Sequence, residues 1–170
     1  FPPAAEETAG SSSAQGMGGL ERVESTTEAT PRGAAEAADE DDPVEAIVRA
    51  LLLDGASREA ALGELAVLMD CAEGDRASAV GAAVRASGGL GPLVELIHVP
   101  AARVDALRTI GNLTADTVDR RAPETKRLLH ELGAFESILA YIYAEHEYTV
   151  VCALGALQNL CSRPKDALLL

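Results

Sequence analysis

Two asparagines stand in matching places of otherwise apolar segments. Asn112 lies in DALRTIGNLT (105–114) and Asn159 lies in CALGALQNLC (152–161), each directly before a leucine. A side-chain carboxamide carries both hydrogen-bond donors and an acceptor, the same kinds of group that a peptide unit carries. These two positions could therefore hold polypeptide backbone, either of a ligand or of a neighbouring part of the chain.

The other reactive side chains form no catalytic or metal-binding pattern. The sequence contains no phosphate-binding glycine loop, no HExxH motif and no GxSxG motif. His98, His130 and His146 lie in separate segments without metal-ligand spacing, and we expect each at the surface. The carboxylates show no pairing that would single out an acid–base couple. We therefore predict that the protein is not an enzyme and binds no cofactor or metal.

The cysteines also indicate a structural role. Their number is odd, and no two are spaced as a Cys-x-x-Cys pair. We expect Cys71, Cys152 and Cys161 to be reduced, mostly buried thiols of an intracellular protein, in the cytoplasm or the nucleus. No apolar run approaches the roughly 18–20 residues that cross a bilayer, so direct membrane insertion is not expected.

The charge of the chain restricts its partners. The 170 residues carry a formal net charge of −13, which is repelled by the phosphates of nucleic acids and by anionic membrane surfaces. Aromatic residues make up only 3% and none is tryptophan, so stacking surfaces for bases are scarce. A protein or peptide is the remaining class of partner, and the sequence leaves the oligomeric state open.

The chain divides into two regions at about residue 42. Residues 1–42 are rich in Ser, Gly and Ala and hold ten acidic residues against two arginines. Such a segment cannot bury enough apolar surface to offset the entropy of ordering it, so we predict a disordered acidic tail. Pro43 suits the first turn of a helix, which predicts that a helical domain begins there and extends over residues 43–170.

In the helical domain the apolar residues recur at helical spacing, and the pattern repeats along the chain. Residues 44–68 match residues 89–113 at an offset of 45, and an offset of 47 carries the end of the second segment onto the last helix. One column of this alignment holds Leu62, Leu107 and Leu154. The sequence therefore predicts an all-α solenoid of about three units.

Each unit is expected to contain a first helix, a short second helix and a longer third helix. Gly88 and Gly133 are expected to end two of the first helices, as glycine commonly does. The expected helices are 43–53, 58–72, 76–87, 90–98, 103–115, 121–132, 134–144 and 148–161. They form units of about 43–75, 76–120 and 121–163, followed by the start of a further unit at 164–170.

The repeated motifs are similar to those of a known family. The run GGLGPLVELI (88–97), followed by VDALRTIGNLT (104–114), resembles the armadillo repeat, and LGAFESILAYI (132–142) with CALGALQNLC repeats the pattern. The resemblance covers about residues 44–163. It implies a right-handed superhelix of stacked units whose third helices line a concave groove. In that family, asparagines on the third helices bind the backbone of an extended peptide.

The last helix shows how an asparagine could face such a groove. Asn159 lies about 200° around the helix from Leu157, so we expect Leu154, Leu157, Leu160 and Cys161 to face the core while Asn159 faces outward. Residues one turn from each asparagine should share its face. The candidate groove residues are Asn112, Asn159, Arg108, Gly155, Asp105 and Asp116. Cys152 lies on the same face, one turn before Gly155.

We predict a non-catalytic protein-binding scaffold or adaptor that binds an extended peptide segment of a partner along this groove. An asparagine can also bond the backbone of a neighbouring unit and hold adjacent units in register. One alternative is therefore an architectural solenoid segment of a larger protein with no ligand of its own. A second is a regulatory module of an enzyme whose catalytic domain lies outside this chain.

Two further expectations concern the surface and the end of the chain. Arg120, Arg121, Lys126 and Arg127 are expected to form a solvated ridge away from the groove. Residues 168–170 are three leucines that would lack a partner. We therefore expect that extending the chain would stabilise it.

Overall fold

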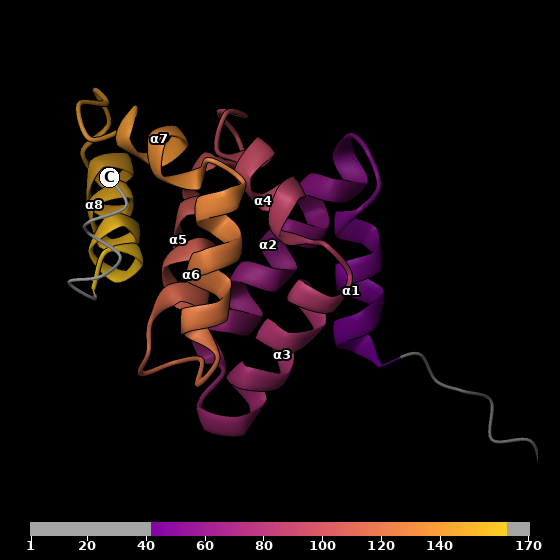
Figure 1. Cartoon of the computed structure of the whole chain (residues 1–170). Coiled ribbons are helices and arrows are strands. Elements are labelled where there is room, and N and C mark those ends of the chain that lie inside the picture. Colours follow the sequence, from indigo (N-terminus) through magenta and orange to yellow (C-terminus); the bar gives the residue numbers. More distant parts are fainter. Residues whose placement is uncertain (1–41, 163–170) are drawn as a thin grey trace, which may run out of the picture. The chain divides into compact units, whose positions relative to one another are not determined.

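The computed structural model describes residues 42–162, which form eight α-helices and contain no strand (Figure 1). The helices are α1 (Pro43–Leu51), α2 (Ala56–Cys71), α3 (Gly74–Ala86), α4 (Leu90–Leu96), α5 (Arg103–Thr114), α6 (Ala122–Glu131), α7 (Ala134–Leu139) and α8 (Glu147–Leu160). The prediction of an all-α fold is confirmed for this range. The predicted acidic tail, apart from Asp42, and the predicted start of a further unit at 164–170 lie outside the described residues.

The boundary that differs most from prediction is the end of α7. This helix stops at Leu139 rather than at residue 144, and residues 140–143 form turns. Tyr141, Ile142 and Tyr143 follow the helix, and such aromatic and β-branched side chains lose rotamer freedom in a helix. The low helix propensity of these residues favours the shorter helix, although Tyr148, Val150 and Val151 are helical in α8.

The first helix begins where the sequence predicts it. Pro43 occupies the first turn of α1, and the side chain of Asp42 accepts a hydrogen bond from the N–H of Val44 at 3.0 Å. A side-chain cap of this kind is worth about 1 kcal/mol. Both features fix the start of α1 at the boundary of the acidic segment.

Glycines follow two helices in equivalent positions, as predicted. Gly88, after α3, has a φ of 79°, and Gly133, after α6, has a φ of 70°. Both are left-handed conformations that are strained for a residue with a Cβ atom. The N–H of Gly89 donates to the carbonyl of Val84 at 2.9 Å, so the turn at Gly88 satisfies a carbonyl of the last turn of α3.

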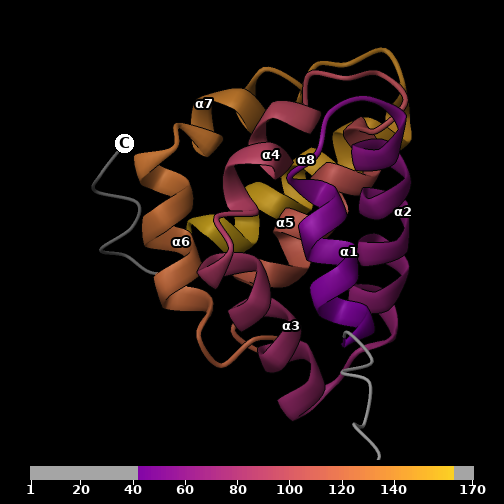
Figure 2. The same ribbon diagram turned by 90° about the vertical axis from the view of Figure 1, so that its right-hand side faces the viewer.

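Helix α5 lies at the centre of the described range. It packs against both α2 and α8, so that α2, α5 and α8 follow one another in Figure 1, and Figure 2 shows the same helices after a 90° turn. Leu62 and Leu65 of α2 are fully buried, as are Leu107 and Ile110 of α5. The leucine columns of the repeat therefore form the core of these two helical layers.

The buried face of α8 differs from the prediction. It consists of small residues and one leucine: Thr149, Ala153, Ala156 and Leu160. Leu154 is exposed, so the prediction that it faces the core is wrong, while Leu157 and Cys161 are only partly buried. A Cβ atom added to Gly111 of α5 would lie 3.7 Å from Cα of Ala156. Small residues face α5 because the two helices approach closely there.

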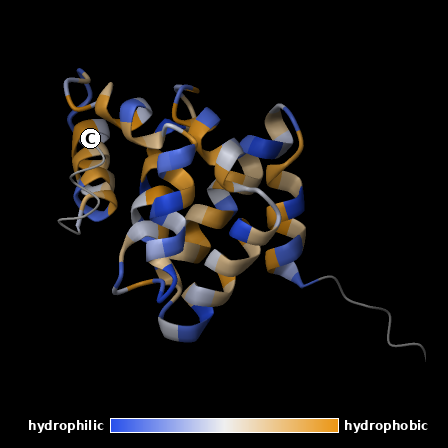
Figure 3. Ribbon diagram, in the orientation of Figure 1, coloured by the Kyte–Doolittle hydropathy of each residue, from blue (hydrophilic) through white to orange (hydrophobic). Residues whose placement is uncertain are grey.

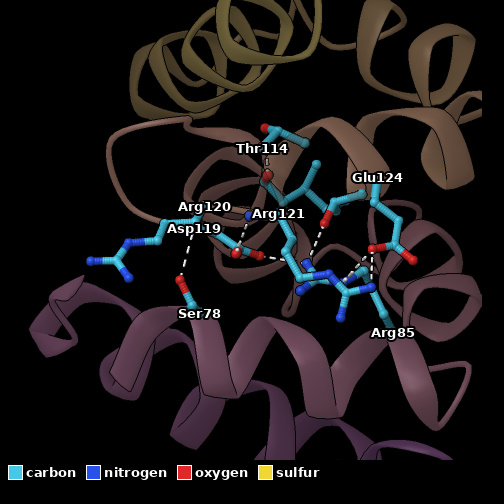
Figure 4. A network of polar contacts seen from close by, with 9 residues as sticks. Ser78, Arg85, Thr114, Asp119, Arg120, Arg121 and Glu124 are labelled. Carbon is cyan, nitrogen blue, oxygen red and sulfur yellow. Dashed lines mark hydrogen bonds and ion pairs between the residues drawn. The ribbon is translucent and has the colours of Figure 1, made fainter. Parts of the chain in front are cut away.

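A buried ion pair joins α3 to the loop between α5 and α6 (Figure 4). Arg85 Nη1 contacts the carboxylate of Asp119 and donates to Thr125 Oγ1 at 2.6 Å. Asp119 Oδ1 also accepts the backbone N–H of Arg121 at 2.8 Å. This carboxylate therefore ties the start of α6 to α3, and it replaces the hydration that the buried guanidinium has lost.

The predicted solvated ridge is wrong for one of its members. Its three arginines are exposed, namely Arg120, Arg121 and Arg127. Lys126 is instead buried, and its Nζ lies 3.2 Å from Asp116 Oδ2 and donates to Ser162 Oγ. The ammonium can be buried because these two oxygen atoms replace water around it.

Gly81 of α3 makes room for the buried ion pair, which leads to a testable expectation. A Cβ atom added there would overlap the carboxylate of Asp119 and lie 3.1 Å from Arg85 Nη1. We expect Gly81→Ala to destabilise the protein by about 1–3 kcal/mol in urea unfolding, because overpacking displaces the ion pair. This loss outweighs the gain of about 1 kcal/mol that alanine brings to an ordinary helix position.

Gly111 provides the matched control within a helix. An added Cβ atom would make only ordinary van der Waals contacts there, the nearest at 3.7 Å from Ala156. Gly111→Ala should therefore leave the free energy of unfolding unchanged or raise it by up to about 1 kcal/mol. Equal effects of the two substitutions would contradict the steric role of Gly81.

Candidate functional site

The structure brings the two matched asparagines to one hollow of the surface. Asn112 comes from α5 and Asn159 from α8, and the hollow between them has a volume of about 270 Å³. Its lining residues are Asp70, Leu107, Arg108, Gly111, Asn112, Cys152, Gly155, Ala156 and Asn159. The packing of α8 against α5 aligns the faces that carry these side chains.

Asn159 joins α8 to α5. Its Nδ2 donates to the carbonyl oxygen of Gly111 at 3.0 Å, and the same oxygen accepts the hydroxyl of Thr114 at 3.1 Å. The bond connects two helices whose sequences match at an offset of 47. Asn159 therefore helps to hold α8 in register on α5.

Asn112 makes the corresponding connection from α5 to α2. Its Nδ2 donates to Asp70 Oδ1 at 3.0 Å. Asp70 also forms an ion pair with Arg108, whose Nη1 lies 3.2 Å from Asp105 Oδ1. These charged side chains are all partly exposed, so solvent weakens their attraction. The carboxylate of Asp70 thus lies between a carboxamide and a guanidinium of α5.

Each carboxamide keeps capacity for a ligand. Within residues 42–162, the structure records one side-chain hydrogen bond for Asn112 and one for Asn159, both through Nδ2. A carboxamide has two N–H donors and an oxygen with two lone pairs. One N–H group and the oxygen of each asparagine therefore remain available to the hollow.

Gly155 is the most open position of the site. A Cβ atom added there would meet nothing within 4 Å, so no neighbouring helix requires a glycine at this place. Glycine in a helix interior costs about 1 kcal/mol relative to alanine. The absence of a side chain enlarges the hollow between Cys152 and Asn159, which lie one turn away on either side.

Asp116 was predicted to belong to this face, and the structure places it elsewhere. Helix α5 ends at Thr114, and the backbone at Ala115 is extended. One-turn spacing therefore no longer applies to Asp116, whose carboxylate faces Lys126 of α6. Asp105 and Arg108 lie on α5 and form an ion pair with each other, but of the two only Arg108 lines the hollow.

Sequence reasoning missed Asp70. This residue lies near the end of α2, and it meets Asn112 only because α2 packs against α5. Helical spacing relates residues of one helix and cannot show which residue of a neighbouring helix lies opposite. No signal in the sequence alone identifies Asp70 as part of this site.

The thiol of Cys152, which lines the hollow, is not activated. Burial raises the pKa of the Cys152 thiol above its ordinary value, although a hydrogen bond with Tyr148 and the charge of Arg108 oppose this shift. The thiol is therefore protonated at neutral pH and is a poor nucleophile. Cys71 is exposed and Cys161 is partly buried, so the expectation of mostly buried cysteines is wrong for Cys71.

Comparisons with known proteins support the fold alone. No family model matches the sequence, and no curated protein resembles it closely enough to count as a relative. The crystal structure of an engineered protein from the Northeast Structural Genomics Consortium is similar, with a TM-score of 0.56 and 18% sequence identity. The match covers 70% of this chain and 45% of the engineered chain, so this chain spans less than half of that protein.

Two other kinds of feature, a membrane-spanning helix and a metal site, do not occur within residues 42–162. None of the helices between residues 42 and 162 has the length and apolar character needed to cross a membrane. Within the same range, no group of three or more His, Cys, Asp or Glu side chains is arranged to hold a metal ion. The hollow at the two asparagines is the candidate site because it brings both matched carboxamides together.

Proposed function

We propose that residues 43–162 belong to a right-handed, armadillo-like α-solenoid that acts as a non-catalytic protein-binding scaffold or adaptor. The groove would be formed by the third helices α2, α5 and α8, and an extended peptide segment of a partner would lie across them. The observation that carries this proposal is the shared hollow of Asn112 and Asn159, which come from equivalent positions of two units. Their unused amide and carbonyl groups suit the backbone of an extended peptide.

The spacing of the helices agrees with an extended ligand. Packed helices lie about 8–10 Å apart, and an extended chain rises about 3.3 Å per residue. Carboxamides on neighbouring helices would therefore meet peptide groups about three residues apart. A side chain between them would fit over Gly155, where the surface is open.

The charges of the site favour a partner without acidic side chains at this point. Asp70 and Asp105 contribute two carboxylates against the single guanidinium of Arg108. The whole chain, including these residues, carries a net charge of −13. A neutral or basic segment would therefore approach the groove faster than an acidic one, and more so at low salt.

One observation favours the architectural alternative. Both asparagines already donate to the neighbouring helix, Asn112 to Asp70 and Asn159 to the carbonyl of Gly111. If these bonds are their whole role, the asparagines hold units in register and the hollow has no ligand. The Gly155→Leu variant separates peptide binding from a purely architectural role.

Gly155→Leu tests the groove without removing a contact. The new side chain would enter open space, so we expect it to fill the hollow while leaving the fold intact. In a binding assay against a labelled library of extended peptides, we expect affinity to fall by roughly tenfold or more, equivalent to about 1.4 kcal/mol. Thermal unfolding should show equal or slightly greater stability, since leucine favours helix more than glycine does.

Gly91→Leu is the matched control. Gly91 lies in α4, away from the two asparagines, and an added Cβ atom there also meets nothing within 4 Å. It should leave peptide binding unchanged.

Asn112→Ala combined with Asn159→Ala should weaken binding and lower stability by about 0.5–1.5 kcal/mol per lost bond. Binding that survives Gly155→Leu overturns the groove, and a wild type that binds no peptide supports the architectural alternative.

A further inference from the structure

A second hollow lies beside Val67 of α2. Val67 matches Asn112 of α5 at an offset of 45, so it occupies the place that asparagines hold in α5 and α8. Its side chain is 63% exposed. The hollow has a volume of about 400 Å³ and is lined by Ile47, Gly63, Glu64, Val67 and Leu68. We call it the α2 hollow, and it shares no lining residue with the hollow of the two asparagines.

The α2 hollow lies in line with the hollow of the asparagines. Gly63 and Val67 are four residues apart and share one face of α2. Their equivalents line the hollow of the asparagines: Arg108 and Asn112 in α5, and Gly155 and Asn159 in α8. Because α5 packs against both α2 and α8, a segment that crosses α8 and α5 along the proposed groove would meet Gly63 and Val67 next.

Glu64 shows that the α2 hollow lies at an end of the described series of helices. It matches Ala156 of α8, and a Cβ atom added to Gly111 of α5 would lie 3.7 Å from Cα of Ala156. That face of α8 is therefore covered by the preceding equivalent helix, α5. Within residues 42–162 no equivalent helix precedes α2, so Glu64 is exposed at the rim of the hollow, on the side away from α5.

The lining of the α2 hollow suits an apolar group. Ile47, Val67 and Leu68 supply aliphatic side chains, and a Cβ atom added to Gly63 would meet nothing within 4 Å. Ile47 comes from α1, which carries both hydrophobic and hydrophilic residues (Figure 3). Valine has no side-chain donor or acceptor, so Val67 cannot bind a peptide unit as a carboxamide does. An aliphatic side chain of a ligand would instead gain free energy by leaving water here.

We infer that the α2 hollow binds an aliphatic side chain of the extended segment whose backbone the two asparagines hold. This inference rests on the proposed peptide-binding function and adds a sequence requirement to it. Packed helices lie about 8–10 Å apart, and an extended chain rises about 3.3 Å per residue. The aliphatic residue would therefore lie about three residues beyond the peptide unit at Asn112, and about six beyond the unit at Asn159.

The charge at the rim adds a basic residue to this requirement. Glu64 places an exposed carboxylate on the side of the α2 hollow that faces away from α5. Side chains two residues apart in an extended segment point to the same side and lie about 6.6 Å from one another. A lysine or arginine two residues beyond the aliphatic residue would therefore bring a positive charge to Glu64. The partner is thus an extended segment in which an aliphatic and a basic residue are separated by one position.

The test begins with peptides that the protein itself selects. The full chain is screened against a displayed random library of roughly twelve-residue peptides, which are long enough to cross three helices at about three residues each. Every residue of the selected peptides is then changed to alanine in turn. We expect one aliphatic position at which alanine weakens binding by about tenfold or more. At low salt we expect a smaller loss, of about threefold, at a basic residue two positions away.

Gly63→Leu assigns the aliphatic position to the α2 hollow. The new side chain would enter open space and fill the hollow, so thermal unfolding should show that the fold is intact. The selected peptide and its alanine derivative should then bind this variant within about twofold of one another. Val67→Asn is a second variant at an exposed position, and it should have the same effect because a carboxamide replaces the aliphatic lining. Glu64→Lys should remove only the preference for the basic residue.

Gly91→Leu is the control, since Gly91 lies in α4 with open space beside it, and this variant should keep both preferences. If Gly63→Leu and Val67→Asn kept the full loss on the change to alanine, the inference would be overturned, while peptide binding in the groove would stand. Selected peptides without an aliphatic requirement would overturn it in the same way. A wild type that binds no peptide would overturn both the inference and the proposed function.

Discussion

Asp119→Ala is expected to destabilise the protein by about 3–5 kcal/mol, because it leaves a buried guanidinium without its carboxylate. The side chain of Asp119 is fully buried, and that of Arg85 is 4% exposed. After the substitution the nearest remaining carboxylate is that of Glu124, 4.0 Å from Arg85 Nε. Arg85 Nε and Nη2 already lack hydrogen-bond partners, so the loss of Asp119 would leave the guanidinium with the neutral hydroxyl of Thr125 as its recorded hydrogen-bond acceptor.

The magnitude matters because globular domains have a total stability of only about 5–15 kcal/mol. The substitution also frees the N–H of Arg121, which donates to Asp119 at the start of α6. Urea unfolding followed by circular dichroism would show the loss as a lower midpoint. We expect part of the population to be unfolded in buffer at 37 °C.

Asp75→Ala is the matched control, because Asp75 also links α3 to the loop before α6. It forms an ion pair with Arg120 at 2.7 Å, and the two side chains are 87% and 75% exposed. Exposed pairs contribute about 0–1 kcal/mol, so this variant should unfold almost as the wild type does. Equal losses in the free energy of unfolding for Asp75→Ala and Asp119→Ala would show that burial does not determine how much an ion pair contributes to stability.

Replacing both partners of the buried pair separates charge from packing. Arg85→Met combined with Asp119→Leu removes the two charges together and fills similar volume. Such exchanges are often neutral or stabilising, because no charge is then left in the interior. We therefore expect the double variant to recover most of the stability that Asp119→Ala loses. A double variant as unstable as the single one would assign the effect to the backbone bond of Arg121.

Local features of the chain were predictable because short-range chemistry decides them. Pro43 and the acidic residue before it fix the start of α1, and Gly88 and Gly133 follow helices in left-handed conformations. The repeat offsets identified the leucine columns that form the core of α2 and α5. In each case the deciding interaction lies within a few residues or is repeated along the chain.

Features that depend on a neighbouring layer were not predictable from the sequence. Leu154 has the same place in its helix as Leu107, yet among residues 42–162 only Leu107 has a helix packed over it. In the sequence Lys126 looks like any surface lysine, but in the structure Asp116 and Ser162 lie against its ammonium. Helical spacing shows which side chains share a face, but it does not show whether that face is covered.

The two asparagines show the same limit at the candidate site. Their spacing predicted a shared face, and the structure places both at one hollow. Whether they bond a neighbouring helix could not be read from the sequence, because the partners Asp70 and Gly111 lie 42 and 48 residues away. The structure supplies those partners, and peptide binding remains the proposal that Gly155→Leu tests.

Leu107→Ala and Leu154→Ala are expected to differ by several kcal/mol, although the two leucines are equivalent in the repeat. Leu107 is fully buried between the layers of α2, α5 and α8, so truncation would remove apolar contacts and leave a cavity. Substitutions of this kind cost about 2–5 kcal/mol. Leu154 is half-exposed on α8, away from the residues of that helix that are buried against α5, and its truncation should change the free energy of unfolding by no more than about 0.5 kcal/mol.

The comparison of the two variants also shows whether the side chain of Leu154 is covered in solution. Both substitutions remove the same three carbon atoms from helix-interior positions, so intrinsic helix propensity and lost volume are nearly matched. The difference between the two unfolding free energies therefore reports the covering of the leucine side chain by the next layer. If Leu154→Ala cost as much as Leu107→Ala, the side chain of Leu154 would be covered in solution. If both were harmless, α8 would not pack on α5 as the structure shows.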